Sequence, residues 1–460
     1  MGRSTQSACD AVEGFAMWSV GPCAGGPDGP SVPAPLVAEA SGRVFASLVR
    51  SGYRLKAEQY VRALLAVPGR KTLKTIGAQW GGAAAGQSMH HFIATSPWDW
   101  RPVRRALAGY AQRTLAPEAL VVAPAVVLGT PPRPAGADRS AVRRRGPAEA
   151  RPQALGAWLV SEAGSVPVDW HLMPLPRFGG VAGSRPETPA RPAAPARSET
   201  PARPGADVRP DTRPDTRSDT DIHPAADGHP GSHGRRGSDG HPADNGVGVT
   251  RAPASHARVL EAAADAARLL RPWHGPIVVD AEGPGAVELI HGLLSRGEDF
   301  IVRVAAGTPL RIDRSRFPRW DARASTAAGL AAALTELRRP LDPGTSAVTA
   351  AAIPVTVEPR SAREHPPALL LLGQWDRGRE PRSLWVTNIR SLSLPALMRL
   401  ARLSDRVRHD MADVSEPLGL RDYAGRSYRG CHHHLTLVSV AQLLAVLHAA
   451  ADRPAHRCAA

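Results

Sequence analysis

Apolar residues recur at helical spacing in the first quarter of the chain. Residues 55–67 carry apolar side chains at i, i+3, i+4, i+7 and i+8, which is the pattern of one helix face. These positions are Ala57, Tyr60, Val61, Leu64 and Leu65. A second helix is predicted over 96–115, where Ser96 and Pro97 give a start signal. Its apolar face comprises Val103, Ala106, Leu107 and Tyr110.

From residue 118 onward the pattern changes to short apolar runs, which favour strands. "EALVVA" at 118–123 is one strand, and residues 155–175 form a β-hairpin with its turn at "SEAGS". After residue 256, strands and helices alternate, which favours an α/β sheet with parallel strands. The predicted strands here are 276–281, 299–304 and 383–388, and the predicted helices are 257–270, 285–297, 395–414 and 436–451.

Between these ordered parts lies a segment that lacks periodicity. Residues 176–252 are rich in Pro, Arg, Thr, Asp and Gly, and such a composition predicts disorder. The expected organisation has six parts. They are a disordered N-terminus (1–35), a helical region (36–117), the first part of an α/β core (118–175), the disordered insert (176–252), the second part of the core (253–450) with an insertion at about 305–382, and a tail (451–460).

Composition adds a strong positive charge. The formal net charge is +15 and the sequence pI is about 10.8, which suits a polyanionic partner such as nucleic acid. Only three of the 57 basic residues are lysines, and Ala, Gly and Pro are abundant, so a GC-rich coding bias explains the charge equally well. The four cysteines are far apart, which fits a reduced cytoplasm. We see no apolar run of membrane-spanning length and no signal peptide, and expect no membrane partner.

Basic residues in the helical region are candidates for contacts with DNA phosphates. They occur in "GRKTLK" and at the start of the second predicted helix, and for each one a solvated helix face is the alternative. The candidates are Arg70, Lys71, Lys74, Arg101, Arg104 and Arg105. Trp98 and Trp100, which lie just before them, are expected to pack within the domain.

Asp280 stands at the end of the apolar run "PIVV". The carboxyl ends of parallel strands are where α/β folds place their chemistry. An aspartate after a strand is also a common turn or helix cap. "CHHH" at 431–434 does not predict a zinc site, because consecutive residues on a helix point in different directions.

Several blocks in order along the chain resemble the insertion-sequence transposases of the RNase H-like DDE class. The blocks are "GRKTLKTIGA", "FIATSPWDWRPVRRALA", "PEALVV", "GSVPVDWHLMPLP", "PIVVDA", "RGEDFIVRV", "SLWVTNI" and "GLRDYAGRSYRGCHHHLTLVSVAQLL". The resemblance spans about 40–450 apart from the insert. It implies an RNase H-like mixed sheet with flanking helices, preceded by a helical region and interrupted by the insert. It also implies double-stranded DNA as partner, a possible homo-oligomer and a place on the nucleoid in the cytoplasm.

The resemblance further implies three carboxylates around Mg²⁺ or Mn²⁺ ions, which activate the attacking oxygen and stabilise the leaving oxygen. Asp280 matches the second acid. The first-acid position holds Ala123, followed by Pro124, and the third-acid position holds Arg408. The basic residue expected after the third acid is matched by Ser415. One remaining carboxylate does not hold a Mg²⁺ pair, so productive metal binding is not expected.

We therefore expect a transposase-family DNA-binding protein that is catalytically impaired. Three alternatives stay open at this stage. One is an active enzyme with rearranged metal ligands drawn from Asp138, Asp405, Asp410, Asp413 and Glu416. Another is a non-catalytic regulator recruited from a transposase, and the third is a decaying gene product.

Overall fold

The centre of the structure is a mixed sheet in which five strands have the order β3-β2-β1-β4-β5. Their bounds are β1 (Ala119–Ala125), β2 (Ala154–Val160), β3 (Ser165–Leu172), β4 (Ile277–Val279) and β5 (Phe300–Arg303). β2 runs antiparallel to β1 and β3, whereas β1, β4 and β5 are mutually parallel. This arrangement is the RNase H-like mixed sheet that we expected, and that expectation is confirmed.

The computed structural model describes ten stretches of the chain. They are residues 32–79, 82–128, 153–173, 256–280, 282–283, 285–318, 325–342, 345–361, 365–376 and 378–452. All of them belong to one unit formed by residues 1–182 and 251–460. The predicted disordered insert lies outside the described residues, as do most of the predicted N-terminal segment and most of the tail.

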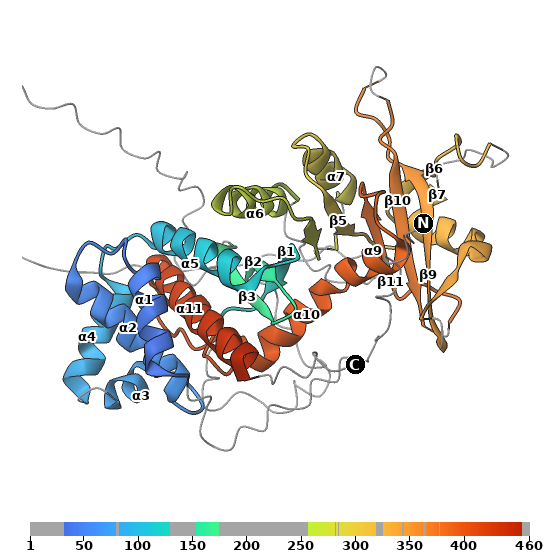
Figure 1. Ribbon diagram of the computed structural model, residues 1–460. Coiled ribbons are helices and arrows are strands. Elements are labelled where there is room, and N and C mark those ends of the chain that lie inside the picture. Colours follow the sequence, from blue (N-terminus) through green and yellow to red (C-terminus); the bar gives the residue numbers. More distant parts are fainter. Residues whose placement is uncertain are drawn as a thin grey trace, which may run out of the picture. The chain divides into compact units, whose positions relative to one another are not determined.

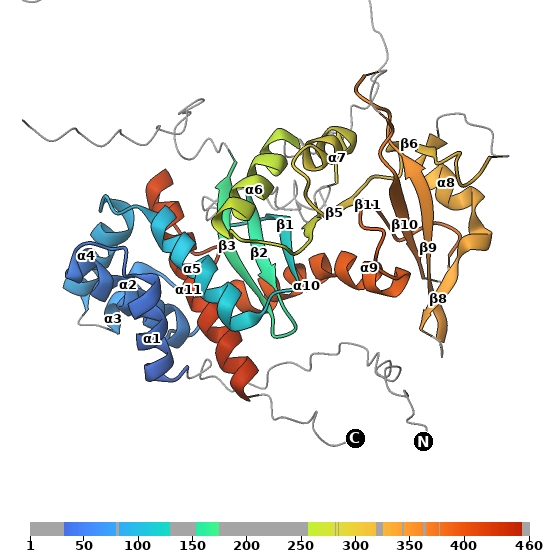
Figure 2. The same ribbon diagram turned by 45° about the horizontal axis from the view of Figure 1, so that its top comes forward.

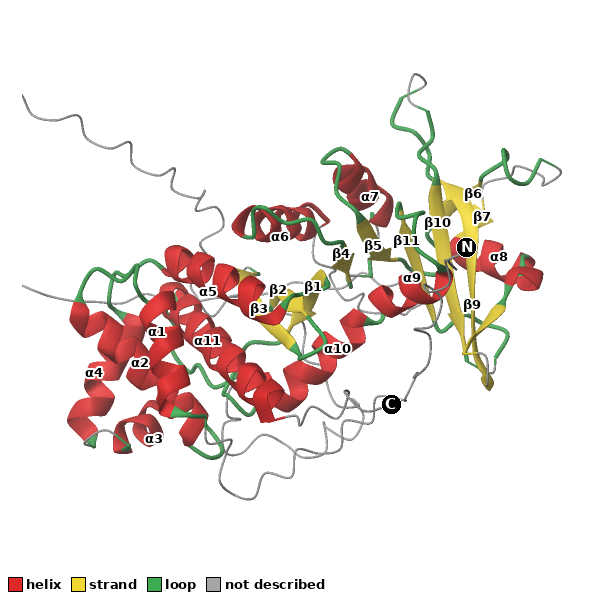
Figure 3. Cartoon of the chain, in the orientation of Figure 1, coloured by secondary structure: helices red, strands yellow, loops and turns green. Residues whose placement is uncertain are grey.

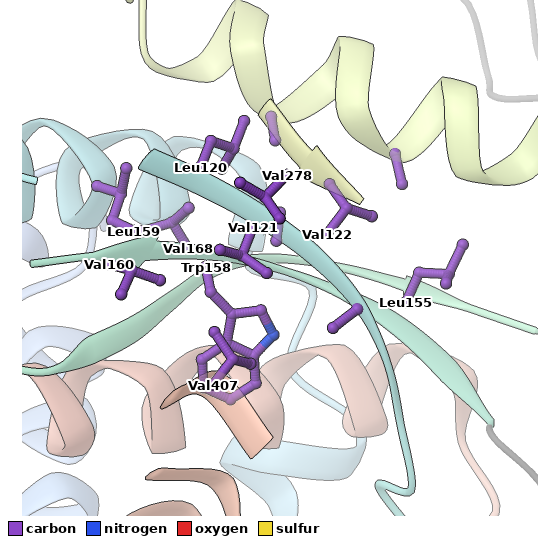
Figure 4. Packing of buried hydrophobic residues seen from close by; sticks show 14 of the residues in the cluster. Leu120, Val121, Val122, Leu155, Trp158, Leu159, Val160, Val168, Val278 and Val407 are labelled. Atoms are coloured by element: carbon purple, nitrogen blue, oxygen red, sulfur yellow. The ribbon is translucent and has the colours of Figure 1, made fainter. Parts of the chain in front are cut away.

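Helices flank the sheet on both faces. α6 (His256–Leu269) packs against β1, β2 and β3, and α7 (Ala286–Leu294) packs against β5. On the other face lie α10 (Leu403–Asp410), which contacts β1 and β2, and α11 (Tyr428–Asp452), which contacts β3 (Figure 1). Figure 4 shows Trp158 of β2 reaching from the sheet toward Val407 of α10. Both side chains are buried, so this contact ties the helix that carries Arg408 to the sheet.

The N-terminal region is entirely helical where the structure describes it (Figure 3). It comprises α1 (Ala34–Val44), α2 (Ser51–Ala66), α3 (Leu73–Ala78), α4 (Ala83–Ala94) and α5 (Trp100–Leu115). α2 buries the face predicted from its spacing. Two boundaries differ from the prediction. α1 begins inside the segment expected to be loose, and α5 begins after Asp99, whose side chain accepts a hydrogen bond from the Arg101 amide, rather than at Ser96.

The segment expected as an insertion extends the sheet. β11 (Ser383–Thr387) pairs with β5, and the order continues through β10, β9, β6 and β7. The other bounds are β6 (Pro309–Ile312), β7 (Ser325–Thr326), α8 (Ala327–Ala333), β8 (Arg339–Asp342), β9 (Thr345–Thr356) and β10 (Leu369–Trp375). The single helix predicted over 395–414 is divided into α9 (Leu394–Ala401), α10 and a π-helical turn, η3 (Met411–Ser415).

Within the described part of the chain, α11 is the one helix whose length and composition would suit a membrane span. The expectation that no apolar run reaches that length was therefore wrong. About two thirds of its most apolar window is buried inside the protein, against α2, α4, α5 and β3. Burial on all sides explains the apolar composition, because a helix at the centre of a fold has no polar face.

Candidate functional site

Asp280 follows β4 at the carboxyl edge of the parallel strands, as the sequence predicts. Its backbone amide donates to the Val122 carbonyl at 2.9 Å, which continues the ladder between β1 and β4. Val122 pairs with Val279 in that ladder. The next residues, Ala123 and Asp280, are therefore neighbours on the same face of the sheet. The first-acid position thus lies beside the second-acid position, but it holds a methyl group.

Two arginines hold the carboxylate of Asp280. Arg303 Nη1 donates to Oδ1 at 3.0 Å, and Arg408 Nη2 donates to Oδ2 at 2.9 Å. Only 11% of the Asp280 side chain is exposed. Arg303 is the last residue of β5 and Asp280 follows β4; because Val279 pairs with Val302, the parallel register sets the next residues, Asp280 and Arg303, side by side. Arg408 approaches from α10, which places the residue at the third-acid position directly against the second acid.

The network extends to two further carboxylates. Arg303 Nε lies 2.8 Å from Glu282 Oε1, and Arg408 Nη1 donates to Asp405 Oδ1 at 2.6 Å. Burial works against the charge of both arginines, but the neighbouring acids outweigh it and raise the pKa of each guanidinium above its ordinary value. Both arginines therefore stay charged. Three carboxylates and two guanidiniums give the network a formal charge of −1.

This geometry does not fit a pair of divalent ions. Mg²⁺ requires several oxygens in near-octahedral arrangement. Each Asp280 oxygen already accepts a bond from a guanidinium, the Ala123 side chain supplies no oxygen, and Arg408 brings positive charge to the place where a metal would lie. The described residues contain no group of three His, Cys, Asp or Glu side chains arranged to hold a metal.

The acids considered as replacement ligands have other partners. Asp410 is buried, accepts the Ser165 amide at 2.7 Å and pairs with Arg406. Asp413 lies 2.9 Å from His409, and Glu416 pairs with Arg421. Asp138 lies outside the described residues. Ser415, at the expected basic position, is buried and donates to Gln442 at 2.6 Å.

Four of the six predicted phosphate contacts are on the surface. Arg70, Lys74, Arg101 and Arg105 are exposed. Lys71 is 6% exposed, and its ammonium group donates to the Val67 carbonyl. Burial lowers the pKa of this ammonium group, although Asp422 acts in the opposite direction. Lys71 in this position does not fit the phosphate contact that we expected.

Arg104 is the second candidate that does not fit. Its guanidinium is buried and donates to Asp169 Oδ1 at 2.9 Å, to Thr436 Oγ1 at 2.9 Å and to the Trp170 carbonyl at 3.1 Å. Burial raises the pKa of the Asp169 carboxyl, but His171 and Arg104 lower it more, so the net pKa lies well below the ordinary value. Arg104 thus joins α5 to β3 and α11 and is a structural residue.

The three consecutive histidines of α11 face different neighbours. His432 Nδ1 lies 3.0 Å from Arg104 Nη2, His433 lies between the Ile93 and Trp98 carbonyls, and His434 lies between the Tyr60 hydroxyl and the Gly419 carbonyl. Burial lowers the pKa of His433 and of His434 to about 4. These rings therefore pack the N-terminal helices against α11 and do not converge on a metal.

One protein family matches this chain. The family model described as DDE superfamily endonuclease matches residues 43–178, which include the N-terminal helices and the β1–β3 meander. The match supports a DDE-superfamily, transposase-like protein. No curated protein matches it. Endonucleases of this superfamily act on DNA and generally use divalent metal ions. The matched stretch includes Ala123, whereas Asp280, Arg303 and Arg408 lie beyond it.

Proposed function

We propose that this DDE-superfamily protein descends from DNA transposases, binds double-stranded DNA and does not cut it. The observation that carries the proposal is the pair of arginines on Asp280, because guanidiniums occupy both oxygens of the remaining acid. The exposed basic residues of the N-terminal helices supply the contacts with DNA phosphates. Its place of action is the nucleoid of the cytoplasm, and it acts there alone or as a homo-oligomer.

A folded core favours a recruited binding protein over a decaying gene product. Apolar residues from the N-terminal helices, the sheet and α11 form a continuous buried cluster. Several buried polar groups are paired far across the chain, as in the bond from Gln442 to the Ser165 carbonyl at 2.8 Å. In a decaying gene product, selection no longer maintains such contacts, and a buried polar group that loses its hydrogen-bond partner destabilises the fold. We therefore expect soluble protein with a cooperative unfolding transition.

The absence of strand cleavage is tested with supercoiled plasmid in the presence of Mg²⁺ or Mn²⁺. We expect neither the wild type nor the Asp280→Ala variant to nick the plasmid, because the described residues contain no free set of carboxylates that could hold the ions. Nicking by the wild type together with its loss in Asp280→Ala would show that other carboxylates complete the site. That result would overturn the non-catalytic part of the proposal.

Binding to DNA is tested by its dependence on salt. Each phosphate neutralised by a basic side chain contributes about 0.9 to the slope of log K against log salt. We expect the Arg101→Ala/Arg105→Ala double variant to bind duplex DNA more weakly and with a slope smaller by about 2. Arg382→Ala serves as a matched control, because Arg382 is equally exposed but pairs with Asp376 on the far part of the sheet. A flat salt response of the wild type would remove the DNA-binding proposal.

A further inference from the structure

An exposed tyrosine lies among arginines at the start of α11. Tyr428 is the one aromatic residue among the exposed large hydrophobic side chains of the described chain, with 48% of its surface accessible. The sequence pattern predicted a role for Arg101 beside it but none for Tyr428. An exposed aromatic ring that is maintained beside positive charge is a feature of surfaces that bind single-stranded nucleic acid.

Two helices, α5 and α6, bring positive charge to this ring. Arg101 is linked to the ring through Trp100 and His432, because its guanidinium lies 5.5 Å from the Trp100 ring, Trp100 stacks on His432, and His432 packs against Tyr428. Burial raises the pKa of the Tyr428 hydroxyl, and the charges of Arg104, Arg101 and Arg258 act in the opposite direction. Arg101 comes from α5, which contacts both α6 and α11 (Figure 2). Arg258 comes from α6. Arg104 is neutralised by Asp169, so Arg101 and Arg258 are the two that carry charge to the surface.

These surface arginines are not neutralised within the described residues. Arg101 and Arg258 are exposed, and neither forms an ion pair with another described residue; the same holds for Arg429, next to Tyr428. Asp99 is the nearby acid on α5, and its carboxylate caps the helix by accepting the Arg101 amide. Three arginines against one aspartate leave the surface positive, which suits a phosphate backbone.

Aromatic stacking holds the ring in place from below. His432 packs against Tyr428 with centroids 4.7 Å apart at 72°, and it stacks on Trp100 at 4.5 Å and 1°. The guanidinium of Arg101 lies 5.5 Å from the Trp100 ring centre. His432 and Arg101 therefore cover Trp100, and Tyr428 is the aromatic side chain of this group that is presented to solvent.

One helix of this surface begins beside the loop that follows β4. His256 begins α6, and a Cβ at Gly285 would lie 2.6 Å from its Nδ1. Gly285 follows Asp280 by five residues and precedes α7. Arg258 is thus one helical turn or less from the loop after β4. Because the Asp280 network has a charge of −1, DNA along this surface would be held by the arginines around Tyr428 and not by the network.

We propose that Tyr428 stacks on an unpaired base while Arg101 and Arg258 bind the adjoining phosphates, so that the protein prefers DNA with an unpaired stretch over continuous duplex. Bases inside a duplex are covered on both faces by their neighbours, so only an unpaired base can stack on the ring. This inference rests on the proposed DNA binding and names the form of DNA that it selects.

The test compares binding to a duplex and to the same duplex with a short unpaired stretch in its centre, at one fixed salt concentration. We expect the wild type to bind the DNA with the unpaired stretch more tightly. Tyr428→Ala should lower that affinity about tenfold and leave duplex affinity unchanged, whereas Tyr428→Phe should retain the preference because it keeps the ring. Arg101→Ala/Arg258→Ala should weaken binding to both DNAs, and Arg382→Ala should change neither.

The outcomes separate this inference from the proposed function. Binding of the wild type to both DNAs with equal affinity would overturn the inference and leave the proposed function standing. Loss of the preference in Tyr428→Phe would also overturn it, because the hydroxyl rather than the ring would then make the contact. Absence of binding to either DNA at low salt would overturn both. Circular dichroism of each variant establishes that it is folded.

Discussion

A variant that carries both Ala123→Asp and Arg408→Glu is expected to bind Mn²⁺, whereas the wild-type chain is not. The first substitution places a carboxylate beside Asp280, because Ala123 and Asp280 are neighbours on one face of the sheet. The second removes the guanidinium that binds Asp280 Oδ2 and puts a carboxylate on the same helical position. Three carboxylates would then face one another with Arg303 as the remaining guanidinium of the network, and this excess of negative oxygen ligands favours a divalent ion.

Calorimetric titration with Mn²⁺ measures this change. We expect the dissociation constant of the double variant to fall to about 1 mM or below, against no measurable binding by the wild type. The melting temperature of the variant should also rise with added Mn²⁺. An ion that binds only the folded chain adds about 1.4 kcal/mol of stability when its free concentration is ten times its dissociation constant. Arg303 still holds Oδ1, so the full affinity of an intact site is not expected.

Arg408→Gln is the matched control for this experiment. It removes the positive charge without adding an oxygen ligand that is ionised, so it should not bind Mn²⁺ measurably. Adding Asp280→Ala to the double variant should abolish the binding that it gained. A double variant that unfolds cooperatively, like the wild type, but binds no Mn²⁺ would show that these positions do not converge as the proposed remnant of a metal site requires.

The sequence alone predicted that Asp280 follows a strand and that Arg408 lies on a helix, but it missed Arg303. The apolar run "PIVV" ends at Asp280 and the run "FIVR" ends at Arg303, and parallel neighbouring strands set their ends side by side. That signal was present in the pattern. The contact between Arg303 and Asp280 could not be read from the pattern, because the direction of a side chain at a strand end depends on the packing of other elements. In this protein the guanidinium of Arg303 packs over the ring of Trp385.

Arg104 and Arg105 show a different limit of sequence reasoning. Arg104 precedes Leu107 and Ala108 by three and four residues, so helical periodicity places it on the buried face, while Arg105 lies outside that face. The helical periodicity of the sequence therefore indicates that Arg104 is buried. It cannot indicate what a buried arginine would bind, because Asp169 comes from a strand 65 residues away and Thr436 from a helix 332 residues away.

Replacing Arg104 and replacing Arg105 with alanine should have sharply different effects on the free energy of unfolding. Arg104→Ala leaves the buried Asp169 carboxylate without its guanidinium, and breaking such a pair costs about 3–5 kcal/mol. Arg105 is exposed and forms no ion pair within the described residues, so Arg105→Ala should change the free energy of unfolding by about 0.5 kcal/mol or less. Urea denaturation at pH 7 measures both values.

The pH dependence of the free energy of unfolding identifies the ion pair between Arg104 and Asp169 as the cause of the stability loss in Arg104→Ala. The pKa of Asp169 is depressed in the folded protein, so its contribution to stability is present above the unfolded value of about 3.9 and is lost as the pH falls toward the folded value. Arg104→Ala removes one of the charges that depress this pKa, so the variant loses less stability in acid. The difference between wild type and Arg104→Ala should therefore shrink as the pH is lowered below about 4.

Replacing Arg104 and Asp169 together distinguishes the contribution of their ion pair to stability from the contribution of side-chain packing. Replacing a buried pair with uncharged side chains of similar volume is often neutral or stabilising, so Arg104→Met/Asp169→Asn should recover much of the stability that Arg104→Ala loses. Equal free energies of unfolding for Arg104→Ala and Arg105→Ala would mean that the guanidinium of Arg104 is not required in the core. Arg104 would then again be a candidate for the phosphate contact that the sequence first indicated.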